Sequence, residues 1–175
     1  MTTDLARRRF NEMVLPQLDD AYGLARWLTG NQTDAEDVVQ DACMRALASL
    51  ETAVVERPRA WMLTIVRNTA FSWMGRNRPK AVVLVGDSEL LDAATAHRDA
   101  SPGPEEALIA AADEAALESA ILALPPIFRE VVIMRDINGM SYREIAAATG
   151  APQGTVMSRL ARARAQLVDK LGSPA

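Results

Sequence analysis

Helix-breaking residues divide this sequence into segments of helix length. Between the breaks the chain is rich in Ala, Leu, Arg and Glu, which favour helix, and only the short run at 81–85 suggests a strand. The pattern therefore predicts an all-α fold. We expect helices over residues 5–29 with a break near Pro16, and then over 33–50, 59–75, 105–123, 127–137, 142–149 and 152–171.

Residues 76–104 have the composition of a linker. Pro79 follows the end of a predicted helix, and the Ala-Ser-Pro-Gly-Pro stretch at 100–104 cannot hold regular structure. The residues between these points are mostly acidic or small. We therefore expect two small helical domains, residues 1–79 and 105–175, joined by an acidic, flexible linker over residues 80–104.

The net charge of −4 hides a segregation of charge along the chain. Residues 51–80 carry a net charge of +4 and residues 127–175 a net charge of +3, whereas residues 81–126 carry −8. Charges more than about 10 Å apart are largely screened in physiological salt, so the local sign decides whether a surface meets phosphates. Two cationic segments separated by an anionic one are compatible with nucleic-acid binding.

The C-terminal part of the chain has the pattern of a helix-turn-helix. Ser141 is followed three residues later by Glu144, as in a capping box, and Gly150 and Pro152 make a turn after one short helix. A longer, basic helix follows this turn. Two such helices form the helix-turn-helix arrangement of DNA-binding proteins. A helical hairpin with solvated charges is the alternative reading of this pattern.

Helical spacing separates two faces of the long C-terminal helix. The inward face is predicted to carry an apolar stripe at Val156, Leu160, Ala163 and Leu167. The opposite face carries small or polar residues, namely Gly154, Ser158, Ala161, Arg162 and Ala165. We expect Ser158 and Arg162 to meet base edges or phosphates. Arg159 and Arg164 flank the stripe and are expected to reach phosphates.

The helix expected over 33–50 combines an apolar stripe with a cluster of carboxylates. Thr33 and Glu36 have the spacing of a capping box. The stripe is predicted at Val39, Ala42, Cys43, Ala46 and Leu50. Three carboxylates that share one face, Asp34, Asp37 and Asp41, suit either a metal ion or the positive end of a helix. A metal site would require a His or further converging carboxylates, so we expect none here.

Two further features limit the possible chemistry. The single cysteine, Cys43, excludes an internal disulfide and a multi-Cys zinc site, and we expect it to be a core residue. No Gly-rich phosphate loop, Cys–His pair or multi-His motif is present, which argues against an enzyme such as a metal-dependent nuclease. We see no targeting segment and no apolar run long enough for membrane insertion, and we therefore expect a cytoplasmic protein without cofactors.

Taken together, these motifs resemble the extracytoplasmic-function sigma factors, the smallest class of the sigma-70 superfamily. Residues 124–135 resemble the start of that family's region 4, and residues 142–146 and 154–164 resemble its helix-turn-helix. Residues 34–41 resemble the core-binding helix of region 2, and residues 59–70 resemble the helix that opens the promoter. The resemblance covers essentially the whole chain in the right order.

The resemblance implies a division of labour between three sets of residues. Contacts to the minus-35 element are expected from the residues Tyr142, Arg143, Gln153, Thr155, Met157, Ser158, Arg159 and Arg162. Contacts to the minus-10 element are expected from Trp61, Arg67, Asn68, Arg76 and Arg78. Docking on core RNA polymerase is expected from Asp37, Gln40, Asp41 and Met44. For the arginines at 67, 76 and 78, salt bridging or solvation is the alternative, and Trp61 suits a core position as well as a functional one.

The resemblance also carries implications for the rest of the chain. The loop Glu51–Arg57 matches the segment that holds an extruded promoter base, and the acidic linker would thread through the polymerase towards the RNA exit path. An anti-sigma factor that covers the binding faces is expected as a partner, besides polymerase and promoter DNA. Met157 departs from the family pattern, because many relatives carry a basic residue there. The alternative function is a conventional helix-turn-helix regulator, which would bind duplex DNA without polymerase.

Overall fold

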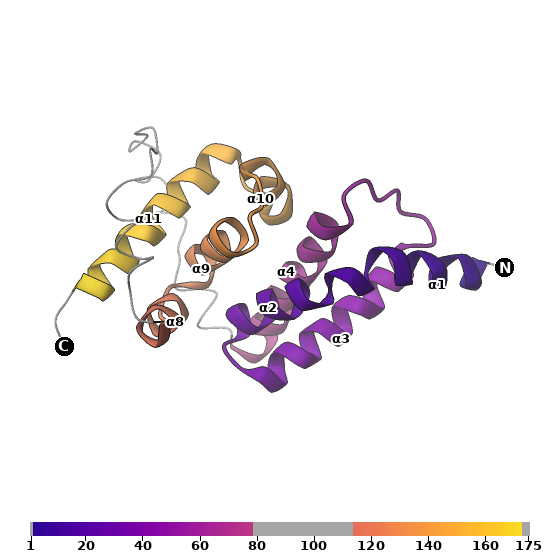
Figure 1. Cartoon of the computed structure of the whole chain (residues 1–175), viewed down its shortest axis with the longest axis horizontal. Coiled ribbons are helices and arrows are strands. Elements are labelled where there is room, and N and C mark those ends of the chain that lie inside the picture. Colours follow the sequence, from indigo (N-terminus) through magenta and orange to yellow (C-terminus); the bar gives the residue numbers. More distant parts are fainter. Residues whose placement is uncertain (1, 79–113, 173–175) are drawn as a thin grey trace. The chain divides into compact units, whose positions relative to one another are not determined.

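The computed structural model describes residues 2–78 and 114–172, and within these ranges all regular structure is helical. These residues divide between two compact units, one built on the helices before residue 79 and the other mostly on the helices after residue 113 (Figure 1). The described helices confirm the all-α prediction. The expected linker at 80–104, the β-prone run at 81–85 and the first turns of the helix predicted to start at residue 105 lie outside the described residues.

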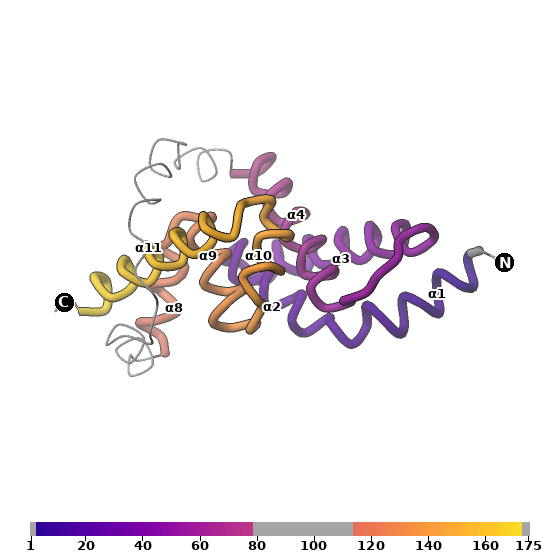
Figure 2. Tube along the Cα trace, turned by 90° about the horizontal axis from the view of Figure 1, so that it is seen from above, coloured from indigo at the N-terminus to yellow at the C-terminus, as the bar shows by residue number. Residues whose placement is uncertain are grey.

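The first unit is a bundle of helices that begins with two segments around Pro16. The helices are α1 (Thr2–Met13), the short 3-10 turn η1 (Leu15–Gln17), α2 (Leu18–Thr29), α3 (Gln32–Ser49) and α4 (Pro58–Asn77). Pro16 lies in η1, which confirms the predicted break, because proline cannot donate the hydrogen bond that a continuous helix needs. Helices α2, α3 and α4 pack against one another, and α1 packs along α3 (Figures 1 and 2).

The core of this unit lies between α2, α3 and α4. Its largest fully buried side chains include Leu24 and Leu28 from α2 and Met62, Leu63 and Met74 from α4. Burial of each large aliphatic side chain contributes about 1.5–3 kcal/mol, so the apolar face of each helix fixes how it packs. The unit thereby holds the outer faces of α3 and α4 in place.

The buried stripe of α3 differs from the predicted one. The buried residues are Ala35, Val38, Ala42 and Ala46, whereas Val39 and Cys43 are only half-buried. Ala42, Ala46 and Leu50 confirm the prediction. The stripe is centred on Val38 because α2 and α4 both pack on that side of the helix, and this leaves Val39 and Cys43 at its border.

The start of α3 corrects the predicted capping box at Thr33. The N-cap is Asn31, whose side-chain oxygen accepts a hydrogen bond of 3.2 Å from the backbone N–H of Asp34. Asn31 follows Gly30, which ends α2 in the left-handed conformation at φ 72°. Because the chain reverses at Gly30, the next capping residue in sequence takes the N-cap and α3 begins before Thr33.

The second unit contains α8 (Glu114–Leu122), α9 (Pro126–Val132), the π-helical turn η3 (Ile133–Ile137), α10 (Tyr142–Thr149) and α11 (Gln153–Gly172). Helix α11 packs on α8 and α9 through Val156, Leu160, Ala163 and Leu167, all of which are buried as predicted. The predicted helix ends at Gly139 and Gly150 are also confirmed, since both residues have left-handed φ angles of 66° and 72°.

The π-helical turn was not predicted. Its signature is the hydrogen bond of 2.8 Å from the N–H of Asn138 to the carbonyl of Ile133, five residues earlier. A π turn holds one more residue than an α turn, so it shifts the faces of the residues that follow. The hydrophobic pattern of residues 127–137 suits both kinds of turn, and for this reason it did not reveal the extra residue.

Candidate nucleic-acid interface

The helix-turn-helix begins with a reciprocal cap. The backbone N–H of Glu144 donates to the hydroxyl of Ser141 at 3.1 Å, and the N–H of Ser141 donates to the Glu144 carboxylate at 2.9 Å. These two bonds satisfy donors that a helix start leaves without partners, and they confirm the predicted capping box. The cap fixes where α10 starts, Gly150 fixes where it ends, and α11 follows three residues later.

The exposed surface of α10 and α11 contains part of the predicted minus-35 set. Arg143, Gln153 and Met157 are exposed, and Met157 is 38% exposed despite its apolar side chain. The half-buried members of the set are Tyr142, Thr155, Arg159 and Arg162. The start of α11 therefore presents polar groups to solvent, as a recognition helix requires.

Ser158 corrects the prediction that it lies on the open face of α11. The residue is only 8% exposed, and its hydroxyl donates a hydrogen bond of 2.9 Å to the carbonyl of Gly154, one turn earlier in the same helix. This back-bond uses the only proton of the hydroxyl. A base or phosphate could therefore meet Ser158 only at its remaining acceptor sites.

Two arginines of α11 have partners within their own unit. Arg164 is 14% exposed at its side chain and forms an ion pair of 2.6 Å with Asp136 in η3. This contradicts the expectation that Arg164 reaches phosphates, because its guanidinium already holds α11 against the π turn. Arg162 lies over the ring of Phe128, 5.5 Å from the ring centre. Arg162 is half-buried.

Helix α4 presents a small polar cluster on its outer face. The guanidinium of Arg67 lies 4.1 Å from the centre of the Phe71 ring and donates a hydrogen bond of 3.2 Å to the side-chain oxygen of Asn68. Asn68 is exposed, and Trp61 is half-buried. The stacking and the hydrogen bond hold the Asn68 amide in one orientation and leave its NH2 group available as a donor.

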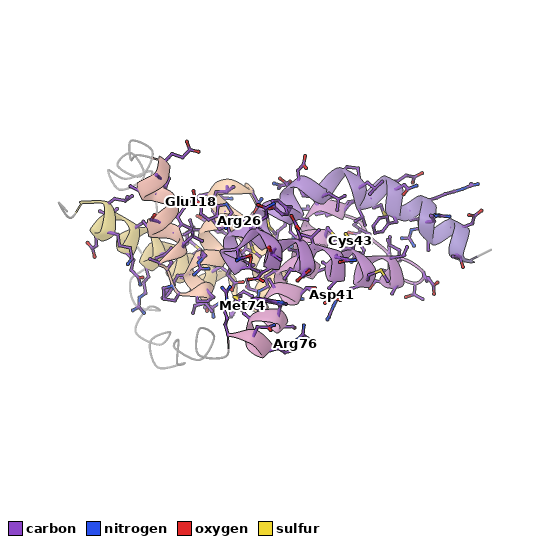
Figure 3. All side chains as sticks on the ribbon, turned by 90° about the horizontal axis from the view of Figure 1, so that it is seen from below. Arg26, Asp41, Cys43, Met74, Arg76 and Glu118 are labelled. Atoms are coloured by element: carbon purple, nitrogen blue, oxygen red, sulfur yellow. The ribbon has the colours of Figure 1, made fainter. Side chains whose placement is uncertain are left out.

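The end of α4 carries two arginines with different surroundings. Arg76, labelled in Figure 3, is exposed, and among the described residues its side chain makes no hydrogen bond or ion pair. Arg78, in contrast, donates hydrogen bonds to the carbonyl of Thr29 at 2.6 Å and to the carboxylate of Asp34 at 3.0 Å, and it lies over the Trp73 ring at 5.3 Å. The alternative of salt bridging, which we weighed for Arg78, therefore holds in this structure.

Helix α3 presents the predicted docking residues on its outer face. Asp37, Gln40 and Met44 are exposed, and the Met44 side chain is 64% exposed. Asp41, labelled in Figure 3, forms an exposed ion pair of 3.2 Å with Arg45 one turn later. The structure thus brings the four residues to one acidic and apolar surface, opposite the buried stripe.

The carboxylates of α3 do not gather around a common point. Asp34 pairs with Arg78 and Asp41 pairs with Arg45. Among the residues that the structure describes, no group of three or more His, Cys, Asp or Glu side chains is placed to hold a metal ion. Cys43 is half-buried beside this face, and its burial raises the pKa of the thiol above the ordinary value.

Sequence reasoning missed one arginine that shapes the loop before α4. The guanidinium of Arg9 in α1 donates hydrogen bonds to the carbonyl of Leu50 and, at 2.7 Å, to the carbonyl of Ala53. Four residues of chain beyond Ala53 lead to Pro58, and Val54 among them is 89% exposed. The run of three arginines at 7–9 gave no sign of this role, because the partners are more than forty residues away.

Two family models match the chain, one in each unit. The model "Sigma-70 region 2" matches residues 13–79, and the model "Sigma-70, region 4" matches residues 114–167. Within residues 2–78 and 114–172, no helix combines the length and the apolar character that crossing a bilayer requires.

Whole-chain comparisons agree with the two models. The chain is 35% identical over 163 residues to the ECF RNA polymerase sigma factor SigE of Mycolicibacterium smegmatis. The matched residues make up 93% of this chain and 61% of that relative. It is 31% identical over 170 residues to the ECF RNA polymerase sigma-E factor of Haemophilus influenzae, covering 94% of this chain and 88% of the relative. The chain thus spans about three fifths of the first relative and most of the second.

Two solved structures share the fold. One contains the sigma factor RpoE of Bartonella quintana in complex with the anti-sigma factor NepR, with a TM-score of 0.70, 28% identity and coverage of 96% of this chain and 99% of that one. The other contains CnrH in complex with the cytosolic domain of CnrY, with a TM-score of 0.67, 25% identity and coverage of 99% of this chain and 94% of that one.

Proposed function

Since this chain belongs to the extracytoplasmic-function sigma factors of the sigma-70 family, we propose that it binds core RNA polymerase and directs transcription from promoters that it selects. Its role is to place and open the promoter, and the polymerase performs the chemistry. Both tasks belong to the cytoplasm, where we place the protein. For the two domains we propose the boundaries expected from the sequence, residues 1–79 and 105–175.

The observation that carries the proposal is the outer face of α3. Asp37, Gln40 and Met44 are exposed together on a helix whose opposite face is buried, in the part of the chain that matches region 2. Exposing the apolar side chain of Met44, which is 64% exposed, to water is unfavourable unless a partner covers it. The carboxylates around Met44 favour a partner with a cationic surface. We assign this face, with Asp41, to core polymerase.

Promoter contacts are proposed for the outer faces of α4 and of the helix-turn-helix. On α4, the Arg67–Asn68 pair and the half-buried Trp61 suit an unpaired base, which requires stacking and hydrogen bonding together. Arg76 suits a phosphate, whereas the ion pair of Arg78 makes it a support for α4 in the first place.

The proposed minus-35 contacts come from the start of α10 and the first turns of α11. Arg143 and Gln153 are exposed and have the donors and acceptors to meet bases or phosphates. Thr155, Arg159, Arg162 and Tyr142 surround them, and Ser158 offers only an acceptor.

We further propose that an anti-sigma protein binds this chain. One structural neighbour described above is a sigma factor in complex with an anti-sigma factor, and the other, CnrH, is in complex with the cytosolic domain of CnrY. The apolar residues Met44 and Leu47 on the outer side of α3 are 64% and 37% exposed, which suits a surface that alternates between two protein partners.

The test is run-off transcription with core polymerase, this chain and a library of promoter fragments. The expected result is initiation at a subset of the library, together with retention of the chain on immobilised core polymerase. A Met44→Asp variant is expected to lose both activities while it keeps the helical circular-dichroism spectrum of the wild type. If the wild-type chain binds duplex promoters alone and ignores polymerase, it is a conventional regulator and the proposal is wrong.

A further inference from the structure

Arg9 lies far from the proposed contact surfaces in sequence but reaches the start of the loop at 51–57. Its guanidinium donates to the carbonyls of Leu50 and Ala53, which lie 41 and 44 residues further along the chain. Leu50 is the C-cap of α3. Helix C-termini leave carbonyl oxygens without partners and carry a partial negative charge, so a cation fits there.

The geometry of arginine explains why one side chain can hold two carbonyls. The planar guanidinium presents several N–H donors in a fixed fork, whereas the ammonium of lysine is a point charge. Its two acceptors lie on either side of the tight turn in which the N–H groups of Thr52 and Ala53 bond to the Ser49 carbonyl at 3.2 and 2.8 Å. By bonding to both carbonyls, Arg9 links the two ends of this turn.

The other end of the loop is also fixed. Pro58 occupies the first turn of α4, and the N–H of Trp61 bonds to the carbonyl of Arg57 at 3.0 Å. Arg59 forms an ion pair of 2.6 Å with Asp20 in α2. Only residues 54–56 remain between the two anchors, and the loop joins the end of α3 to the start of α4 (Figure 2).

We propose that Arg9 is a positioning residue for promoter recognition: it fixes the loop at 51–57 in the conformation that receives the extruded base. This inference rests on the proposed function and on the match of this loop to the family segment that holds an extruded promoter base. Val54, directly after the Ala53 anchor, is 89% exposed, so the position of its side chain contributes little to the stability of the fold. The hydrogen bonds from Arg9 reduce the number of conformations that the loop can adopt. A loop that is already ordered loses less conformational entropy when it binds a promoter base.

The experiment compares Arg9→Ala, Arg9→Lys and Arg8→Ala as holoenzymes with core polymerase. Arg8 is the control, because it is an exposed arginine on the same helix and its loss changes the net charge equally. Run-off transcription is measured on promoters that differ at single minus-10 bases, and the readout is the ratio between preferred and disfavoured bases. A residue that only stabilises the fold would lower all rates by one factor and leave this ratio unchanged.

For Arg9→Ala the ratio is expected to fall by about fivefold, the scale of one ordinary hydrogen bond lost at a half-exposed site. Arg9→Lys is expected to keep part of the ratio, and Arg8→Ala all of it. Hydrogen exchange of the Thr52 and Ala53 amides gives a second readout without polymerase, and both amides are expected to exchange faster in Arg9→Ala only.

The outcomes separate the two proposals. If the wild type initiates and Arg9→Ala keeps both the ratio and the exchange rates, the positioning role is overturned and the proposed function stands. If Arg9→Ala does not fold, Arg9→Lys decides by the same ratio, and an unchanged ratio there refutes the inference. If the wild type directs no initiation with core polymerase, both proposals are wrong.

Discussion

Arg78 is expected to stabilise the first unit through three contacts, of which the ion pair with Asp34 is one. In Arg78→Ala three interactions are lost together. The ion pair, between side chains that are 44% and 23% exposed, is worth about 0.5 kcal/mol. The hydrogen bond of 2.6 Å to the Thr29 carbonyl is worth about 1 kcal/mol, and the stacking on Trp73 about 0.5 kcal/mol.

The free energy of unfolding of the first unit should therefore fall by about 2 kcal/mol. Urea titration followed by tryptophan fluorescence measures this change. The chain has 3 tryptophans, Trp27, Trp61 and Trp73, and all of them lie in the first unit, so their emission reports on that unit alone. With a slope of about 1 kcal/mol/M for a unit of this size, the midpoint should fall by about 2 M.

Arg76→Ala is the matched control, because it removes the same charge from the same helix end. Its midpoint should stay within about 0.5 M of the wild type, since an exposed side chain outside such contacts contributes little. Equal midpoints for the two variants would refute the reasoning that Arg78 serves the fold first. Conversely, Arg76→Ala should weaken promoter binding and lower its salt dependence by about one counterion.

The remaining predictions concern other surfaces and the second unit. Met44→Ala should weaken binding to core polymerase by about tenfold in a fluorescence-anisotropy titration, because it removes an exposed apolar contact without opening a cavity; unchanged affinity would remove Met44 from the docking face. Met157→Arg should steepen the salt dependence of minus-35 binding by about one unit of slope, since it adds one phosphate contact. Ser141→Ala should destabilise the second unit by about 1 kcal/mol, measured by hydrogen exchange of the buried amides of that unit, because the reciprocal cap is lost. Cys43 should react with a thiol reagent more slowly than free cysteine at pH 8, and the rate should rise as pH increases, because burial raises its pKa and only the thiolate reacts.

The sequence predicted the bounds of a helix correctly where a capping residue marks its start and a glycine marks its end. The bounds of α10, Tyr142–Thr149, follow from the cap at Ser141 and from Gly150, and the structure has the same bounds. Where two capping residues compete, as Asn31 and Thr33 do, the choice depends on how the preceding turn closes, and the sequence pattern alone selected the wrong one.

Interactions between distant segments could not be predicted. Arg78 and Thr29 are 49 residues apart, and Arg9 and Ala53 are 44 apart, so no helical period links them. Ser158 was predicted to lie on the open face of α11 but is buried. Helical spacing within one helix gives no information about which neighbouring segments pack against it. The predicted exposure of Asp37, Gln40 and Met44 is confirmed, while their roles as contacts stay predictions.

The anchored loop with its exposed tip has an evolutionary consequence. Selection on stability acts weakly at Val54, since a side chain that is 89% exposed contributes little to folding. After a gene duplication, the tip could accept new residues one mutation at a time and acquire a new target sequence, while both copies still fold and still compete for the same enzyme. Divergence of regulatory networks would then begin in this loop rather than in the helices.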